Sequence, residues 1–544
     1  MSLTMSPKNE IPIVDLFAGP GGLGEGFSAH DRFRIIVSAE MDEHAHSTLR
    51  LRAFYRIAKR HANPDVLEAY YRFCNKGSAL PDTGIIAEAW NEAEREAQRL
   101  TLGDPEDNQR LDNIITANSI GPTTPWVLIG GPPCQAYSLV GRARNRGKTD
   151  YVPEEDHRHF LYKEYLRIIQ KYRPAVFVME NVKGIISSSI NGERIFKTIM
   201  KDLVDPDQAI GKTSSGPKYR IHSLSYPVAF DHKTDHAAHD PLKYIVRAED
   251  YGIPQARHRV FLLGIREDFK IDWSPNLQPV MPKSSVGLAL RNLPPRRSQL
   301  SRGKDSPEAW LDTVKQHFIE LQSAAHEQNQ KSLADAFATH YGNLHGILST
   351  GSLRSVKAIG DSPVDDLAAW YDDPNLRVWL NHEARGHMAS DLLRYSYASS
   401  YAKLYEKSPK GHTGFSLLEK LRPSHANWES GKFADRFRVQ HFDQPATTIT
   451  SHISKDGHYF IHPDPTQCRS LTVREAARLQ TFPDNYFFQG NRTQQFHQVG
   501  NAVPPLLAFK IAKIVLSVID NTDEVRKALP AEQSMQPPHQ FALM

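Results

Sequence analysis

Residues 11–40 read IPIVDLFAGPGGLGEGFSAHDRFRIIVSAE, and the order of elements in this segment indicates the fold class. An apolar, β-rich run over residues 11–17 leads into Gly19-Pro20-Gly21-Gly22-Leu23-Gly24, which fits the pattern G-x-G-x-x-G. A predicted helix follows, and then a predicted strand over residues 34–39. Glu40 closes this second strand at the position where an acid can hydrogen-bond ribose hydroxyls. The order of elements predicts a Rossmann-like βαβ unit that binds an adenosine-containing cofactor.

The glycine pattern does not select one cofactor. Its tight turn lets a ligand approach the backbone closely, which suits a nicotinamide dinucleotide and S-adenosylmethionine equally. A glycine-rich turn that binds no ligand is the structural alternative.

Composition describes an ordinary soluble protein. The chain has 544 residues, of which 40% are hydrophobic and 24% charged, and this length suits two to four domains. Its three cysteines (Cys74, Cys134 and Cys468) lie far apart, which excludes a disulfide framework or a Cys-Cys metal motif. We see no signal peptide and no apolar run near the about 20 residues of a membrane span, so we expect a cytoplasmic protein. A net charge of +4 and a pI near 8.7 permit a polyanionic partner.

Cys134 follows the apolar run 126–129 and the sequence Gly130-Gly131-Pro132-Pro133. The two prolines fix φ and remove backbone donors, so the thiol is expected at a rigid turn where a strand ends. This placement favours a reactive cysteine. The alternative is a small buried hydrophobe, the role of most free cysteines.

Glu180 follows a second apolar strand, predicted over residues 175–179, in the run Glu180-Asn181-Val182. A helix predicted over residues 160–172 precedes that strand. Open α/β sheets bind ligands at the carboxyl ends of their strands, where burial can make a carboxyl a proton donor or hydrogen-bonding acid. The alternative is a glutamate that caps a helix.

Arg257 and Arg259 precede a predicted strand over residues 260–265. Residues two apart on an extended segment point to the same side, so both guanidinium groups suit one phosphate or carbonyl oxygen. A surface charge cluster is the alternative. The last third of the chain adds a predicted short helix over residues 474–480 and the run 498–505, which opens an apolar helix over residues 506–519.

In this order, five blocks resemble the motifs of the DNA (cytosine-5)-methyltransferase family, in its bacterial modification-type form. Residues 15–27 resemble the cofactor loop, 131–135 the nucleophile loop, 180–182 the Glu-Asn-Val motif, 255–259 the Gln-x-Arg-x-Arg motif, and 474–480 with 498–503 the final pair. The resemblance covers about residues 10–50, 125–265 and 440–520. It implies an α/β fold: a Rossmann-like S-adenosylmethionine-dependent methyltransferase domain with a smaller target-recognition domain.

The resemblance also implies a reaction, the transfer of a methyl group from S-adenosylmethionine to C5 of cytosine in a specific double-stranded DNA sequence. Cys134 would attack C6 of a base flipped out of the duplex. Glu180 would hydrogen-bond N3 and the exocyclic amine, and Arg259 would bind the ring carbonyl oxygen, with Arg257 supporting the pocket electrostatically. The residues do not identify the base that removes the C5 proton.

Cofactor contacts follow from the same resemblance. Phe17 would stack on the adenine, and Glu40 would hold the ribose. Asp104 would take the place of the family's Asp after the third strand, although the segment before it is unusually long. The expected cofactor-binding residues are Phe17, Gly19, Gly21, Gly22, Leu23, Glu40, Met41, Asp104, Pro132, Leu161, Asn501 and Ala502.

DNA contacts are expected from the nucleophile loop and from the exit of the recognition domain. Residues 138–151 are polar, basic and glycine-containing, as a loop that closes on a DNA backbone would be. The expected DNA-binding residues are Gln135, Ser138, Arg142, Arg144, Thr448 and Thr450.

Expected domains are a mobile N-terminus (1–10), a catalytic cofactor-binding domain (11–270, with a helical insertion at about 50–120), a target-recognition domain (271–440), a return to the catalytic domain (441–520) and a mobile tail (521–544). The recognition domain has the composition for phosphate contacts, with Arg291, Arg296, Arg297, Arg302 and Lys304 near prolines. It shows no helix-turn-helix or zinc-finger pattern, so its residues do not predict which DNA sequence is the target.

Three histidines, His232, His236 and His239, have a spacing that could hold zinc on one helix face. Three aspartates beside them favour a solvated polar loop, so we expect no metal.

Other classes of protein explain less of the pattern. A nicotinamide oxidoreductase would leave Cys134, Glu180 and Arg259 without a joint role, and a non-catalytic DNA-binding relative would be expected to have lost the nucleophile. An RNA (tRNA) cytosine-5 methyltransferase is the main alternative, although the long basic recognition interval favours DNA. Expected partners are double-stranded DNA and a cognate restriction endonuclease encoded nearby, with no membrane and a monomer on DNA. The expected role is restriction-modification or phage defence.

Overall fold

The computed structural model describes residues 10–133, 161–190, 193–234, 239–344, 346–357, 365–423, 428 and 436–520. Its main sheet has the strand order β3-β2-β1-β4-β5-β12-β8-β9, with β10 paired to β12. These strands are β1 (Ile11–Leu16), β2 (Phe33–Glu40), β3 (Ala97–Arg99), β4 (Val127–Gly130), β5 (Val176–Val182), β8 (Tyr219–His222), β9 (Ala229–Phe230), β10 (Ile245–Arg247) and β12 (His258–Arg266).

The first five strands of this order are parallel, and β12 runs antiparallel to β5, β8 and β10. The strand order reverses between β1 and β4, where Leu16 pairs with Gly130. Ligands of open α/β sheets bind outside the carboxyl ends of strands at such a switch point. The glycine loop after β1 and the loop before Cys134 therefore start side by side.

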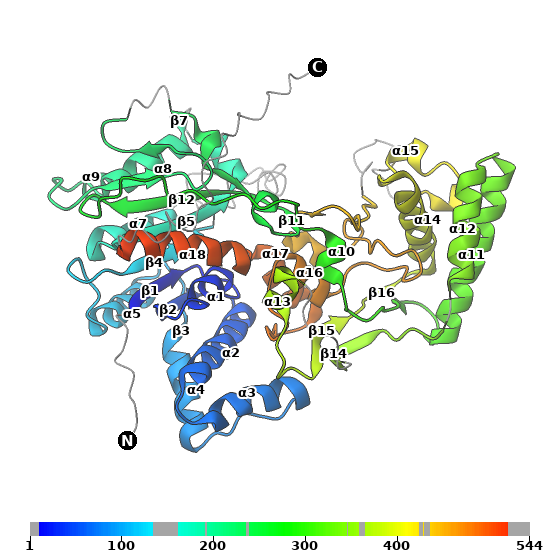
Figure 1. The fold of residues 1–544 in the computed structure, drawn as a ribbon, viewed down its shortest axis with the longest axis horizontal. Helices are drawn as coiled ribbons and strands as arrows, with labels where there is room; N and C mark the ends of the chain where they lie inside the picture. Colours follow the sequence, from blue (N-terminus) through cyan, green and yellow to red (C-terminus); the bar gives the residue numbers. More distant parts are fainter. Residues whose placement is uncertain are drawn as a thin grey trace.

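Alternating residues of β1 enter two separate cores, as the period of a strand requires. Val14 and Leu16 pack with α5 (Pro105–Ala117), α7 (Leu161–Tyr172) and α8 (Ile195–Val204). Ile11 and Ile13 pack with α1 (Gly22–Ser28) and α18 (Pro505–Asp520) on the other face. Figure 1 shows α18 lying across the sheet beside α1, although the two helices come from opposite ends of the chain. The predicted α/β fold is confirmed.

The helical segment Arg492–Asp520 includes an 18-residue window with mean hydropathy 1.9, of which 67% is buried. By length and composition alone, this helix could cross a membrane. We expected no apolar segment of that length from the sequence. The burial of the helix against the sheet accounts for this apolar character, since a core helix needs the same residues.

The predicted insertion is largely helical. It contains α2 (Glu43–Arg60), α3 (Pro64–Lys76) and α4 (Gly84–Glu96), and α5 follows. The expected helical character is wrong for residues 97–99, which form β3 and pair with β2 at the sheet edge. Backbone pairing with an open strand overrides the helical preference of this alanine-rich and charged segment.

A helical lobe, made of α11 (Pro307–Glu327), α12 (Lys331–Gly342) and α14 (Ala389–Tyr405), has its own apolar core and lies apart from the main sheet (Figure 1). Between the lobe and the sheet lie α16 (Val473–Leu479), α17 (Arg492–Asn501) and the hairpin of β14 (Gly351–Val356) and β15 (Val378–Glu383). β11 (Gln255–Ala256), which directly precedes β12, pairs in parallel with β17 (Ala446–Thr447), which follows the helical lobe in the chain.

Shorter elements complete the described chain: η3 (Lys183–Ile186), β6 (Ser189–Ile190), β7 (Glu193–Arg194), α9 (Pro206–Ala209), η4 (Pro241–Tyr244), η5 (Ala248–Tyr251), α10 (Val286–Leu290), β13 (Gln299–Leu300), α13 (Asp366–Tyr371), β16 (Gly386–His387), α15 (Gly411–Gly414), η6 (Glu419–Leu421) and η7 (Ser451–Ser454).

Candidate active site

The glycine loop is tied to the end of β2 by Glu40. The Gly19 amide donates to Glu40 Oε2 at 2.7 Å, and the Asp42 amide donates to Oε1 at 2.8 Å. Burial raises the pKa of Glu40. Each carboxylate oxygen can accept more than one hydrogen bond, so Glu40 can hold the loop and still accept a ligand hydroxyl.

The loop itself adopts backbone conformations that favour glycine. Gly19 and Gly21 have φ of 57° and 96°, and Phe17 shares the left-handed region with φ of 57°. A Cβ at Gly19 would meet no atom within 4 Å, whereas one at Gly22 would lie 2.2 Å from the Val503 carbonyl oxygen. The loop is therefore open at Gly19, where a ligand can approach the backbone, and tightly packed behind Gly22.

Asp15 supplies a second carboxyl beneath this loop. It is buried on β1, and neither of its oxygens has a hydrogen-bond partner among the described residues. A Cβ at Gly24 would lie 3.0 Å from Asp15 Oδ2, which places the carboxyl against the first turn of α1. Burial raises the pKa of Asp15 to about 8. The glycine loop is thus bordered by Glu40 and lies above Asp15, whose carboxyl has no partner among the described residues. Two such acceptors fit a ligand that carries several hydrogen-bond donors, and S-adenosylmethionine carries them on its ribose, adenine and amino groups.

Other expected cofactor residues gather near the same sheet edge. A Cβ at Gly103 would lie 3.8 Å from Leu161 Cδ2, so the β3–α5 turn contacts the start of α7. Asp104 follows this glycine, is exposed, and caps α5 by accepting hydrogen bonds from the Glu106 and Asp107 amides. Leu23, Pro132 and Ala502 are buried, while Met41 and Asn501 are exposed.

A second group of residues lies at the ends of β5 and β12. Arg259 Nε is 3.1 Å from Glu180 Oε1, and both side chains are largely buried. Burial lowers the pKa of Arg259, and the nearby Glu180 opposes this shift. A Cβ at Gly131 would lie 3.2 Å from Glu180 Oε2, and Asn181 Nδ2 donates to the Pro132 carbonyl oxygen at 3.1 Å. The ion pair therefore borders the loop that leads to Cys134.

The expected nucleophile, Cys134, and four expected DNA contacts, Gln135, Ser138, Arg142 and Arg144, lie outside the described residues. The other two expected DNA contacts lie in the described part of the chain. Thr448 Oγ1 donates to the Ala256 carbonyl oxygen at 2.6 Å, and Thr450 is the N-cap of η7. Both threonines thus lie beside the Gln-x-Arg-x-Arg segment.

Arg257 is more buried than its expected role in the base pocket implies. Its Nη1 donates to the Ile449 and Gly500 carbonyl oxygens at 2.9 and 3.3 Å. Burial holds its pKa well below the usual range, and the nearby Arg259 lowers it further. The guanidinium therefore holds the segment after β17 and the end of α17 beside the start of β12, and the nearby Glu180 opposes the lowering of its pKa.

Gln255 and Gln480 form further buried hydrogen bonds between the same segments, and we did not predict these roles from the sequence. Gln255 Nε2 donates to Gln480 Oε1 at 2.9 Å, and Gln255 Oε1 accepts from the Ile449 amide at 2.8 Å. Gln480 Nε2 then donates to the Val499 carbonyl oxygen at 2.7 Å. Both glutamines are fully buried. The only signal in the sequence was their presence in two motif blocks.

The basic residues expected to contact phosphate divide into two groups. Arg296 and Arg297 are buried, with 8% and 4% exposure, and bind Ser349 and Asp305. The expectation of phosphate contacts is therefore wrong for these two, because their guanidinium groups are engaged inside the fold. Arg302 and Lys304 are exposed, and Arg291 pairs with Asp365 at the surface.

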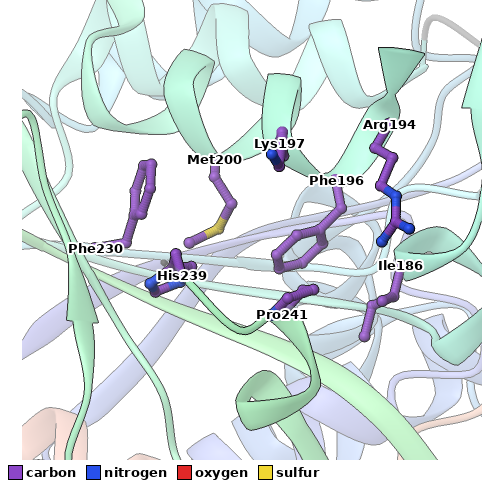
Figure 2. Close-up of a pocket in the computed structure, with 8 residues that line it drawn as sticks. All are labelled: Ile186, Arg194, Phe196, Lys197, Met200, Phe230, His239 and Pro241. Atoms are coloured by element: carbon purple, nitrogen blue, oxygen red, sulfur yellow. The ribbon is translucent and has the colours of Figure 1, made fainter. Parts of the chain in front are cut away.

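The histidine trio does not share a helix among the described residues. His232 pairs with Glu267, His239 packs against Phe230 and Tyr244, and His236 lies outside the described part. A cavity of about 330 Å³ lies beside His239 (Figure 2). It is lined by Ile186, Arg194, Phe196, Lys197, Met200, Phe230, His239 and Pro241. None of these belongs to the glycine loop or to the Glu180–Arg259 pair.

Comparisons with known proteins agree with this geometry. The profile of the C-5 cytosine-specific DNA methylase family matches residues 107–207 and 240–517. The type II methyltransferase M.Bpa9945I of Bacillus paralicheniformis is 30% identical over 93% of this chain and 99% of that protein. The type II methyltransferase M.AgeI of Thalassovita gelatinovora is 26% identical over 92% of this chain and 98% of that protein.

Among solved structures, a DNA modification methyltransferase encoded within an E. coli prophage superimposes with a TM-score of 0.53. It covers 94% of this chain and 100% of its own, at 18% sequence identity, and so shows a shared fold. The sequence matches decide the family, since they span more than half of the chain. The chain belongs to the C-5 cytosine-specific DNA methylase family and is a DNA cytosine-5 methyltransferase.

Proposed function

We propose that this enzyme methylates C5 of cytosine in one specific double-stranded DNA sequence through a covalent Cys134–C6 adduct on a flipped base, with S-adenosylmethionine as methyl donor. The observation that carries the proposal is the Glu180–Arg259 pair at 3.1 Å, bordered by Gly131 and Pro132 three and two residues before Cys134. A carboxyl and a guanidinium side by side match the two polar edges of a cytosine ring.

The proposed steps conserve atoms and charge. The Cys134 thiolate forms a bond to C6, and Glu180 gives a proton to N3 while accepting from the exocyclic amine. Arg259 donates to the ring carbonyl oxygen, which stabilises the electron density that moves into the ring. C5 then carries enamine character and takes the methyl group. Loss of the C5 proton to a base and cleavage of the C6–S bond regenerate the thiolate, and return of the N3 proton to Glu180 leaves neutral 5-methylcytosine.

Cofactor binding is assigned to the cradle around Gly19. When bound, S-adenosylmethionine supplies an electrophilic methyl group on a sulfonium. Glu40 is positioned at the edge of the loop to accept ribose hydroxyls, and Asp15 lies below it as an acceptor for ligand donors. Phe17, Asp104, Leu161, Pro132 and Asn501 are proposed to complete the site.

DNA is proposed to bind across the nucleophile loop and the exit of the target-recognition domain. The contacts assigned are Gln135, Ser138, Arg142, Arg144, Thr448 and Thr450. We assign residues 11–270 and 441–520 to the catalytic domain and 271–440 to target recognition, with the enzyme acting as a monomer in the cytoplasm. Relatives that carry type II methyltransferase names support a restriction-modification role beside a cognate endonuclease.

The test is transfer of labelled methyl from S-adenosylmethionine to unmethylated duplex DNA by the wild type and by Cys134→Ser. Label at cytosine C5 with the wild type alone is expected, and its position gives the target sequence. Cofactor binding by Cys134→Ser, measured by calorimetry, is the control for folding. Label on RNA but not on DNA would overturn the substrate, and equal transfer by both proteins would overturn the nucleophile.

A further inference from the structure

The α2–α3 insertion touches both halves of the proposed function. On one side it contacts the glycine loop and α1, and on the other it contacts the hairpin β14–β15. Figure 1 shows α2 beside α1, and α3 reaching towards β14 and β15. One apolar cluster contains Leu49, Tyr70 and Cys74 of the insertion together with Val378 and Leu380 of β15. Hydrogen bonds inside this contact form a continuous path.

The path begins under the cofactor cradle. Glu25 of α1 is buried, and its two carboxylate oxygens accept from Nε and Nη2 of Arg52 on α2, with the Nε bond at 2.8 Å. The Arg52 guanidinium lies over the rings of Tyr55 and Tyr486. Tyr486 in turn donates to the Pro20 carbonyl oxygen within the glycine loop. The planar fork of Arg52 therefore supports the loop from below at two points.

Arg52 also reaches away from the loop. Its Nη1 donates to Asn485 Oδ1 at 2.9 Å, and Asn485 Nδ2 donates to Asp373 Oδ2. Asp373 Oδ2 accepts a second bond from the Tyr71 hydroxyl of α3 at 2.6 Å. Asp373 lies in the segment that leads into β15, within the proposed target-recognition domain. We call Glu25, Arg52, Asn485, Asp373 and Tyr71 the Arg52 network.

The end of α3 then holds the hairpin directly. Asn75 Nδ2 donates to the Asn375 carbonyl oxygen at 3.0 Å, and Asn75 Oδ1 accepts from the Arg377 amide at 2.8 Å. Arg354 of β14 donates to the Cys74 and Phe73 carbonyl oxygens at 2.9 and 3.1 Å. These bonds between side chains and backbone set the position of the hairpin relative to α3, and so relative to the glycine loop.

We propose that Asp373 of the recognition domain and Tyr71 of α3 are positioning residues that act on the cofactor loop, so that cofactor binding and DNA binding are coupled through the Arg52 network. This inference rests on the proposed cofactor and DNA sites. Buried hydrogen-bond networks resist partial disruption, because each lost bond leaves a buried polar group unpaired. In this proposal, DNA bound to the recognition domain acts on the segment that contains Asp373, and the network carries the effect to Arg52 and the loop. Coupling of this kind is reciprocal between the two ligands.

The experiment measures the dissociation constant of S-adenosylhomocysteine, the unreactive demethylated product, with and without a duplex that contains the target. The full chain is compared with Tyr71→Phe, which removes one hydroxyl, and with Asp373→Asn. Asp372→Asn is the matched control, since Asp372 pairs with Lys357 outside the network. We expect the duplex to tighten binding to the wild type and the control, and this factor to fall at least about threefold in the two variants.

Reciprocity gives an internal check, because S-adenosylhomocysteine must change the affinity for DNA by the same factor. A lower melting temperature in Tyr71→Phe and Asp373→Asn with an unchanged factor would assign the network a purely structural role and overturn the inference. A wild-type factor of one would overturn it as well. Absence of S-adenosylhomocysteine binding to the wild type would instead remove the proposed cofactor site, and the inference with it.

Discussion

Arg259 Nε lies 3.1 Å from Glu180 Oε1, across two antiparallel strands in which Glu180 pairs with Phe261. The two residues are 79 positions apart in the chain. Because β12 inserts antiparallel beside β5, the last residues of one strand meet the first residues of the other. This pairing brings the acid and the cation of the proposed base pocket to one edge of the sheet.

Glu180→Gln keeps the shape of the side chain and removes its acidic proton. We expect the single-turnover rate of methyl transfer to fall about 10²- to 10⁴-fold, the range of a lost general acid. Affinity for S-adenosylmethionine is the control and should be unchanged, since Glu180 lies outside the glycine loop. A rate within a few-fold of wild type would contradict the assigned role.

Arg257→Lys tests whether Arg257 stabilises the segment after β17 and the end of α17 through its backbone hydrogen bonds. The lysine side chain ends one bond short of the arginine Nη1 that donates to both the Ile449 and Gly500 carbonyl oxygens, so at least one of them loses its bond. A buried unsatisfied group costs about 1–3 kcal/mol, and we expect the free energy of unfolding in urea to fall by this amount. An unchanged free energy of unfolding would show that the Arg257 hydrogen bonds do not stabilise the fold.

Gly26→Ala tests the contact between α1 and α18. A Cβ there would lie 2.3 Å from the Pro505 carbonyl oxygen and 2.5 Å from the Phe509 amide nitrogen, so one helix must shift. Overpacking costs about 1–3 kcal/mol, which thermal melting would detect. Gly342→Ala at the end of α12 is the control, because its Cβ meets no atom within 4 Å and should leave stability equal or slightly higher. Equal stability of both variants would refute the close contact.

His382 makes stability depend on pH. Its Nε2 bonds to the Pro294 carbonyl oxygen and its Nδ1 to Thr472 Oγ1, and burial lowers its pKa to about 3. Below the unfolded pKa of about 6.5, the unfolded chain binds a proton that the folded chain does not. Because of this residue, the free energy of unfolding falls by about 1.4 kcal/mol for each unit by which the pH is lowered between about 6.5 and 3.

Urea unfolding at several pH values between 7.5 and 5 checks this slope. His382→Gln is expected to reduce the slope of the unfolding free energy against pH by the contribution of about one proton. The exposed His326 provides the control, since His326→Gln should leave the slope of the wild type. An identical slope in His382→Gln would contradict the assignment.

The elements around the motifs follow from local sequence. The predicted strand over residues 11–17 is β1, and the predicted helix over residues 160–172 is α7. Glycines in the first loop are needed where φ is positive at Gly19 and Gly21, a requirement that the pattern G-x-G-x-x-G reflects directly. These features depend on neighbours within one turn or one strand, so a single sequence is sufficient to predict them.

Long-range partners could not be predicted in the same way. Arg296 and Arg297 have the composition of DNA contacts, yet the fold buries them against Ser349 and Asp305. The insertion was predicted as helical, but nothing in its residues indicated that Arg52 would bind Glu25 and Asn485, 27 and 433 positions away. Such pairs depend on how distant helices pack, and residue type alone does not encode that packing.

The residues alone are sufficient to predict the βαβ start, the order of the five motif blocks and the family that these blocks resemble. Only the fold shows which of the motif residues touch: Glu180 with Arg259, Gln255 with Gln480, and Arg257 with the backbone of Ile449 and Gly500. The two kinds of information differ in the sequence distance over which they act. Hydrophobic period and turn chemistry act over a few residues, whereas these contacts form only when sheet order and helix packing bring remote segments together.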